Sequence, residues 1–267
     1  MATEGGLYLD FWGLKEKPFE NTPDPKFFYS SKMHTEALSR ILYALTNNKG
    51  CVLLTGEYGC GKTALVRKVI EALDPDLYEL ALINYPIFSS NEFLREVLFQ
   101  YGVDTTTGSK LELFHRVSTF GYENLNKGKQ NILVIDEAQL IEDSEIFEQI
   151  RLLLNLQLED KGLVSIFLVG QPELRERVMT YPQLDQRIGV RYHIHYFGHD
   201  DVIAYIRHRL RIAGTSREIF TQEAYVAITR ASHGVPRRVN NICDLCLLDG
   251  AAAQAEIIDE DIVKKIQ

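Results

Sequence analysis

The chain has few cysteines, no long apolar run and no basic start. Its 267 residues include four cysteines, at positions 51, 60, 243 and 246, too few for a disulfide framework, and a reducing compartment fits them best. No stretch approaches the roughly 20 apolar residues of a membrane helix. The segment 1–10 lacks the basic start and apolar centre of a signal peptide. These absences predict a cytoplasmic protein without direct membrane insertion; if the protein works at a membrane, a partner must take it there.

Basic residues are also in the minority. The formal net charge is -8 at pH 7, which argues against a broad basic surface and so weakens nucleic-acid binding. A local basic cluster nevertheless stands in one C-terminal segment, at Arg207, His208, Arg209 and Arg211. Such a cluster is usually a hydrated helix face, but DNA or an acidic partner stays open as its ligand.

Aromatic and proline residues are concentrated near the start of the chain. The prolines are Pro18, Pro23 and Pro25, and they interrupt regular backbone hydrogen bonding. The rings are those of Tyr8, Phe11, Trp12, Phe19, Phe27, Phe28 and Tyr29. This composition predicts an irregular segment over residues 1–30 that packs its rings on a core.

Apolar patterning then alternates between strand and helix periods. Short apolar runs predict strands at 51–55, 78–85, 131–136, 163–170 and 190–197. Helical spacing predicts helices at 32–45, 61–73, 90–101, 109–126 and 144–158. Strands that alternate with helices form a parallel sheet covered on both faces, so the pattern predicts an α/β fold.

The strand pattern stops at Gly198. Helical spacing continues over 200–213, 221–232, 235–253 and 259–266, with Asp200 and Thr221 as suitable N-caps of the first two. The sequence therefore predicts two domains: an α/β domain over 1–198, which includes the aromatic segment 1–30, and a small all-helical lid domain over 199–267.

One motif points directly to nucleotide binding. Residues 56–63 match G-x-x-x-x-G-K-[ST] between a predicted strand and a predicted helix. Glycines let backbone N–H groups turn toward phosphates, and a helix start aims its positive end at them. The motif predicts ATP contacts from Gly56, Glu57, Tyr58, Gly59, Cys60, Gly61, Lys62, Thr63 and Ala64. Lys62 should reach the β- and γ-phosphates, and the Thr63 hydroxyl should bind Mg²⁺. The alternative is a chance match in a glycine turn.

The predicted strand 131–136 ends at a carboxylate, and a second carboxylate follows it directly. Ligand sites of open parallel sheets lie at the carboxyl ends of the strands. Asp136 is therefore placed to hold Mg²⁺, directly or through water, and Glu137 to orient and activate an attacking water. Taken alone, the pair fits a turn with solvated acids, but beside a phosphate loop it predicts an ATP hydrolase.

The phosphate loop, the acidic strand end and the helical lid together resemble the AAA+ ATPases. More narrowly, the chain resembles the general secretion pathway protein A (ExeA-like) group. The matching segments are 11–14, 18–19, 22–25, 27–29, 34–38, 57–59, 136–139, 170–174 and 234–240. The resemblance implies a P-loop NTPase (AAA+) sheet with a helical lid. It also implies a homo-oligomer with ATP at subunit interfaces, and a partner in type II secretion or pilus assembly.

The resemblance implies three further site residues. Gln171 stands at the end of the fourth strand, where the family contacts the γ-phosphate or the water; alternatively it is a turn residue before Pro172. Arg187, with Arg191 in reserve, matches the arginine that is supplied to the neighbouring subunit's ATP; alternatively it forms a surface salt bridge. Arg237 matches the lid arginine that faces the nucleotide, with a solvated charge as the alternative.

The adenine side is less defined. Tyr29 and His34 precede the first strand, where the resemblance implies contacts to the base. Core packing explains Phe27 and Phe28 better. The pair Cys243 and Cys246 sits inside a helical pattern without two more zinc ligands at suitable spacing, so core cysteines are the better interpretation.

Three functions compete at this stage. The first is a mechanochemical ATPase that serves an envelope machine, although full-length members of that group continue into a membrane helix and a peptidoglycan-binding region. The second is an ATP-dependent DNA-binding regulator, such as a subunit that selects target sites for a transposase. The third is a nucleotide-gated scaffold that hydrolyses slowly, against which Lys62, Asp136 and Glu137 argue.

Overall fold

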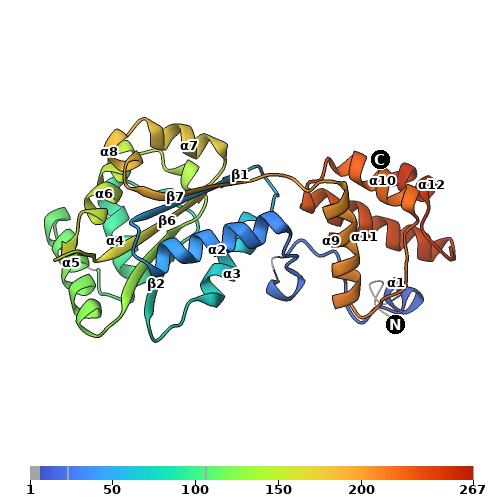
Figure 1. The fold of residues 1–267 in the computed structure, drawn as a ribbon, viewed down its shortest axis with the longest axis horizontal. Coiled ribbons are helices and arrows are strands. Elements are labelled where there is room, and N and C mark those ends of the chain that lie inside the picture. The colour runs from blue at the N-terminus through green and yellow to red at the C-terminus, as the bar shows by residue number, and fades with distance from the viewer. Residues whose placement is uncertain (1–6, 23, 106, 267) are drawn as a thin grey trace. The chain divides into compact units, whose positions relative to one another are not determined.

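The computed structural model describes residues 7–22, 24–105 and 107–266, which fall into two compact units (Figure 1). The sheet unit consists of residues 33–57 and 65–194. The helical unit consists of the described residues of Met1–Lys32, Tyr58–Ala64 and His195–Gln267. Residues 1–6 of the segment tested for a signal peptide lie outside the described residues, as does Pro23 of the aromatic segment.

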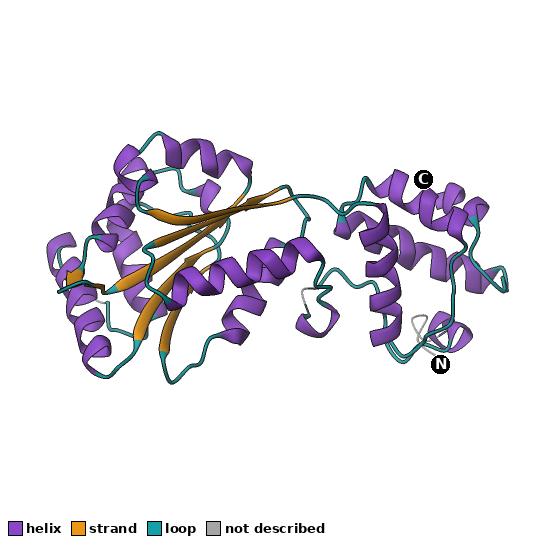
Figure 2. Ribbon diagram, in the orientation of Figure 1, coloured by secondary structure: helices purple, strands orange, loops and turns teal. Residues whose placement is uncertain are grey.

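The sheet unit contains the predicted parallel sheet. Its five strands stand in the order β2-β3-β6-β1-β7, and all pairs are parallel. The bounds are β1 (Cys51–Gly56), β2 (Tyr78–Ile83), β3 (Gln130–Ile135), β6 (Val164–Gly170) and β7 (Ile188–Ile194). Because neighbouring strands are parallel, the connections between them are long crossovers, and these crossovers contain the helices (Figure 2).

Helices cover the sheet because its strands are apolar on both faces. The helices are α2 (Lys32–Thr46), α3 (Lys62–Ala72), α4 (Ser90–Gln100), α5 (Lys110–Asn126), α6 (Ser144–Leu154), α7 (Pro172–Met179) and α8 (Pro182–Asp185). Leu53, Leu133 and Leu168 pack in one core with residues of α4 to α8. Their neighbours Leu54 and Val134 point to the opposite face and are buried as well, which confirms a sheet covered on both sides.

Three local elements differ from the sequence-based expectation. Helix α6 ends at Leu154, not at 158, because β4 (Gln157–Leu158) pairs with β5 (Lys161–Gly162) as a hairpin. Its turn is made by Glu159, with φ 54°, and Asp160. Helices α7 and α8, missing from the prediction, both begin with proline, which suits the first turn of a helix.

The helical unit contains the four predicted C-terminal helices. They are α9 (His199–Ile212), α10 (Gln222–Ser232), α11 (Pro236–Ala252) and α12 (Glu260–Ile266). Thr221 caps α10 as predicted, because its hydroxyl accepts a hydrogen bond from the backbone N–H of Ala224 at 3.1 Å. The prediction for Asp200 is wrong: Gly198 is the N-cap of α9, and Asp200 lies in the first turn. Among the described residues, none of the helices combines the length and the hydropathy that a membrane span requires.

The aromatic N-terminal segment groups with the helical unit, although the sequence analysis assigned it to the α/β domain. It contains a short helix, α1 (Leu7–Trp12), and a 3-10 turn, η1 (Pro25–Phe27). The Trp12 indole N–H donates to the carbonyl of Leu247 at 2.8 Å, and the Tyr8 hydroxyl donates to Asp244 at 2.9 Å. Helix α1 forms because the prolines all come after it. The rings do pack on a core, and that core is built from α9 to α12.

Candidate functional site

The carboxyl edge of the sheet brings three predicted site residues together. Ile135 pairs with Leu168, and Thr55 pairs with Gly170. Strands β3, β6 and β1 are neighbours that run the same way, so they end at the same edge. Asp136, Gln171 and Gly56, the first residue of the phosphate loop, therefore lie along one edge of the sheet unit, where ligands of open α/β folds bind.

The phosphate loop has the predicted strand–loop–helix context. It follows β1, and α3 begins at Lys62. Gly59 and Gly61 take φ values of +78° and +98°, which glycine adopts without steric cost. Lys62 and Cys60 are buried, whereas Thr63 is exposed and Ala64 half-buried. The helix start thus directs its backbone N–H groups into the loop, the arrangement that holds phosphates.

Within the helical unit, the tip of this loop contacts the start of α11. A Cβ atom at Gly59 would lie 3.1 Å from Val235 Cγ1 and 3.3 Å from Arg237 Cβ. The Arg237 guanidinium donates a hydrogen bond to the Tyr58 hydroxyl and lies 5.4 Å from the Tyr58 ring centroid. The arginine predicted from the lid therefore stands beside the phosphate loop, and the loop position it faces tolerates only glycine without a shift.

The two acidic residues differ in environment and backbone conformation. Asp136 is buried at 4% exposure, and its Oδ1 accepts the N–H of Glu137 at 2.9 Å. Glu137 is half-buried and adopts φ 51° and ψ 34°, the left-handed region that non-glycine residues rarely enter. Such strain is characteristic of functional positions. The two adjacent carboxylates therefore differ in burial and in backbone conformation.

Gln171 is the N-cap residue of α7, but its side chain makes no capping hydrogen bond. Its backbone N–H donates instead to the side chain of Gln139 at 3.0 Å. Gln139 was overlooked as a site residue in the sequence, where it formed only part of the segment 136–139. The signal that could have found it is its place two residues after Glu137, at the edge where β6 also ends.

A magnesium ion fits the donor chemistry of Thr63 and Asp136. Mg²⁺ prefers oxygen ligands and takes only one or two from the protein, with the rest from phosphates and water. No group of three or more His, Cys, Asp or Glu side chains able to hold a metal occurs among the described residues. A magnesium ion held by Thr63 and Asp136 stays a prediction.

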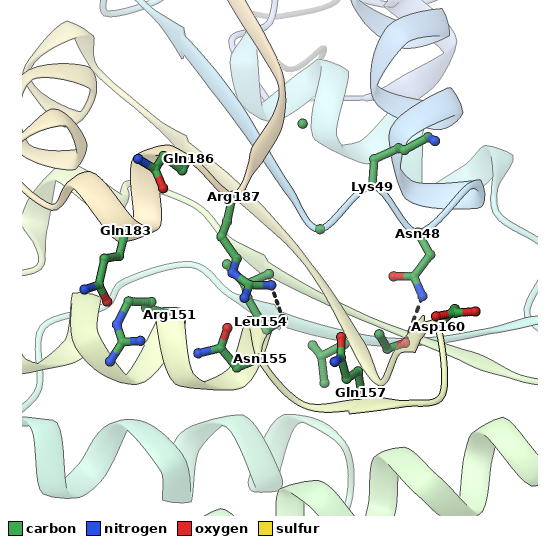
Figure 3. A pocket seen from close by; sticks show the side chains of 14 residues that line it. Asn48, Lys49, Arg151, Leu154, Asn155, Gln157, Asp160, Gln183, Gln186 and Arg187 are labelled. Atoms are coloured by element: carbon green, nitrogen blue, oxygen red, sulfur yellow. Dashed lines mark hydrogen bonds between the residues drawn. The ribbon is translucent and has the colours of Figure 1, made fainter.

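Arg187 lies at the opposite edge of the sheet. It precedes β7, and its carbonyl accepts the N–H of Cys51 at the start of β1 at 3.2 Å. Six strand residues separate this edge from the carboxyl edge, a distance of about 20 Å. Arg187 is exposed and lines a pocket of about 660 Å³ with Lys49, Arg151 and Asn155 (Figure 3). It is therefore remote from the carboxyl edge of its own chain.

The reserve candidate, Arg191, is already paired. Its guanidinium forms an ion pair with Asp185 at 2.7 Å. The contact that Arg187 makes among the described residues is longer: its Nη1 lies 3.4 Å from the carbonyl oxygen of Leu154. Arg187 is thus the arginine more available to a second molecule.

The residues predicted for the adenine side lie in different units. Tyr29 belongs to the helical unit, where its ring lies 5.8 Å from that of Phe197 and its hydroxyl 3.4 Å from Asp201 Oδ1. Partial burial, reinforced by Asp201, raises the pKa of the Tyr29 hydroxyl above its ordinary value. His34 belongs to the sheet unit and is buried in α2. A role in base binding stays a prediction for both.

The cysteine pair belongs to a core, as predicted. Cys243 and Cys246 are both fully buried on α11. Burial raises the pKa of the Cys246 thiol to about 12, and that of Cys243 well above its usual range. Both therefore stay protonated and unreactive at neutral pH.

The basic cluster on α9 is not one continuous exposed face, and DNA or an acidic partner as its ligand stays a prediction. Arg209 is buried at 5% exposure and donates hydrogen bonds to the carbonyls of Pro18 and Glu20. Arg207 forms an ion pair with Glu218 at 2.9 Å. Residues three or four positions apart share a helix face, so Arg207, His208 and Arg211 lie on one side of α9, and the buried Arg209 does not contribute to it.

Arg209 should instead be essential for the stability of the helical unit. Its replacement by leucine leaves the carbonyls of Pro18 and Glu20 without this donor, so we expect a loss of about 3 kcal/mol in the free energy of unfolding. Urea unfolding followed by the fluorescence of Trp12, the single tryptophan, measures this. Arg211→Leu, on the exposed side of α9, is the matched control. Equal stability of the two variants would contradict the assignment.

Comparison with known proteins agrees with this geometry. Residues 45–178 match the AAA domain family. The general secretion pathway protein A of Aeromonas hydrophila is 40% identical over 261 residues, 96% of this chain and 47% of that protein. The chain therefore spans about half the length of this relative.

Solved structures share the fold at low sequence identity. The ORC2 protein of Aeropyrum pernix, in its ADPNP-ADP complexes, has a TM-score of 0.68 and 16% identity, with 94% of this chain and 71% of that chain covered. The RuvB Holliday junction branch migration motor of Thermotoga maritima has a TM-score of 0.58 and 18% identity, with 90% and 72% covered. Both likenesses confirm the predicted fold class.

Proposed function

Because the chain belongs to the AAA family of ATPases, we propose that it hydrolyses ATP with magnesium, using Lys62, Thr63, Asp136 and Glu137. The observation that carries the proposal is the strained, half-buried Glu137 next to buried Asp136, on the sheet edge from which the phosphate loop departs. Two carboxylates with different burial support two different tasks. Asp136 serves the metal, and Glu137 serves the water.

In the proposed reaction each residue has one defined task. The Glu137 carboxylate accepts a proton from the attacking water, whose oxygen bonds to the γ-phosphorus while the bond from phosphorus to the β–γ bridging oxygen breaks. Lys62 neutralises charge on the β- and γ-phosphate oxygens. Mg²⁺ supplies further neutralisation when bound through Thr63 and Asp136. Gln171 and Arg237 contact the γ-phosphate region, and Tyr29 and His34 the base.

We further propose that the protein works as a homo-oligomer in which Arg187 serves the ATP of a neighbouring copy. The distance of Arg187 from the carboxyl edge of its own sheet supports this arrangement. The similarity to a general secretion pathway protein supports a protein partner in a secretion or pilus system. We place the protein on the cytoplasmic side of the inner membrane, held there by that partner.

DNA binding with ATP is the weaker alternative. The net charge of -8 and the burial of Arg209 both reduce the basic surface that DNA requires. A gel shift with and without ATP, at two salt concentrations, decides between the two functions. Binding through phosphate contacts would produce an ATP-dependent shift that weakens with salt.

Replacement of Lys62 by alanine tests nucleotide binding. We expect the Kd for Mg-ATP to rise about 10- to 100-fold, because charge-assisted hydrogen bonds to the phosphates are lost. Isothermal titration calorimetry measures this change. Lys68→Ala on the same helix is the control, since Lys68 pairs with Glu71 at 2.8 Å on the surface. An unchanged Kd for Lys62→Ala would rule out the proposed phosphate contact.

A further inference from the structure

The amide of Gln139 joins two elements of the site. Gln139 lies in a 3-10 turn, Ala138–Leu140, directly after Glu137. Its Nε2 donates to Glu137 Oε2 at 2.5 Å, and its Oε1 accepts the backbone N–H of Gln171 at 3.0 Å. One side chain therefore connects the carboxylate of the proposed base to the end of β6.

Only one orientation of this amide satisfies both partners. A carboxylate accepts hydrogen bonds and a backbone N–H donates one, so the NH₂ group must face Glu137 and the oxygen must face Gln171. A rotation by 180° would set oxygen against carboxylate and NH₂ against N–H. The two bonds thus fix the amide plane, and with it the direction from which Glu137 is held.

The surroundings leave Gln139 little freedom. A Cβ atom at Gly170 would lie 2.6 Å from Gln139 Oε1, so glycine at the end of β6 provides the space that the amide fills. Arg177 Nη1 donates to the backbone carbonyl of Gln139 at 3.0 Å, and its guanidinium lies 5.1 Å from the Phe147 ring centroid. The turn is held from its backbone as well as from its side chain.

We propose that Gln139 is a positioning residue that holds the Glu137 carboxylate in its productive direction and couples that direction to the end of β6. Glu137 needs such support because its own backbone is strained and its side chain is only half-buried. A shift of Gln171 moves its N–H, the amide follows, and the carboxylate follows the amide. The proposal rests on the proposed function, since it assigns the support of the same base.

Two substitutions separate the two hydrogen bonds. Gln139→Met keeps the length of the side chain and removes both bonds. Gln139→Glu keeps an acceptor for the Gln171 N–H but removes the donor to Glu137 and adds a second negative charge. We expect kcat to fall about 10- to 100-fold in both variants, with KM and the Kd for ATP within about twofold of wild type. Gln100→Met is the matched control, because it removes a Gln–Glu hydrogen bond of 2.7 Å on α4.

A double-mutant cycle distinguishes positioning from general stability. If Gln139 acts through Glu137, then Gln139→Met adds nothing to Glu137→Gln under single-turnover conditions. A merely structural role would lower the residual rate again and would lower the melting temperature in both backgrounds. Wild-type kcat in Gln139→Glu, or a full further loss in the double variant, would overturn the proposal. Wild-type turnover in Glu137→Gln alone would instead overturn the proposed function.

Discussion

Glu137→Gln should lower kcat for ATP about 100- to 10,000-fold, because the amide cannot accept the proton of the attacking water. The change preserves the size of the side chain, and glutamine still accepts a hydrogen bond through its oxygen. Affinity for ATP should therefore stay within about threefold of wild type, since Glu137 is assigned to the water and not to the nucleotide. The steady-state release of phosphate measures turnover, and calorimetry measures the Kd.

The matched control for this change is Glu142→Gln. Glu142 lies five residues further on and is exposed. Glu142→Gln therefore removes the same negative charge as Glu137→Gln, but away from the end of β3. Normal turnover in Glu142→Gln beside a large loss in Glu137→Gln would assign the effect to the site. Equal turnover in wild type and Glu137→Gln would refute the assignment of the base.

Arg187→Ala should lower kcat about 1,000-fold, because a trans arginine stabilises the charge that spreads over the transferred phosphoryl group. The Kd for ATP of each subunit should change little, since Arg187 lies at the amino edge of the sheet in its own chain. Arg191→Ala is the control, because the ion pair of Arg191 with Asp185 already engages that guanidinium. Loss of activity in Arg191→Ala alone would transfer the role to that residue.

A mixing experiment tests whether Arg187 acts on a neighbouring copy. Subunits with Glu137→Gln keep Arg187, and subunits with Arg187→Ala keep Glu137. In a mixed oligomer, some interfaces unite an intact arginine with an intact base, so part of the wild-type rate should return. Light scattering confirms that both variants assemble. No recovery in mixed oligomers of confirmed composition would contradict supply in trans.

The sequence predicted the sheet well because its strands are short apolar runs separated by helical periods. The five strands and the phosphate loop were predicted from local sequence patterns, and local patterns also determine where these elements form. The hairpin β4–β5 was missed because two-residue strands have no periodicity to detect. Helix α7 was missed because Pro172 suggested a turn, although proline is also common in the first turn of a helix.

The sequence predicted Asp136 and Glu137 because their carboxylates stand at the end of a recognisable apolar strand. Gln139 could not be assigned, because its role depends on the end of β6, more than 30 residues later, and on the space at Gly170. The burial of Arg209 was likewise hidden, since its partners are carbonyls of residues about 190 positions away. Every residue has a backbone carbonyl, so the residue type does not indicate which carbonyl accepts a hydrogen bond.

Helix α1 and helix α11 join through a hydrogen bond that spans 235 residues. During synthesis, Trp12 leaves the ribosome long before Leu247 exists, so its ring has no native partner while most of the chain is made. The sheet unit draws on residues 33–57 and 65–194 and can begin to fold in that interval. Contacts of such long sequence separation form slowly because a large loop must close first. The N-terminal rings therefore stay without their native core until the last helices of the chain have been made.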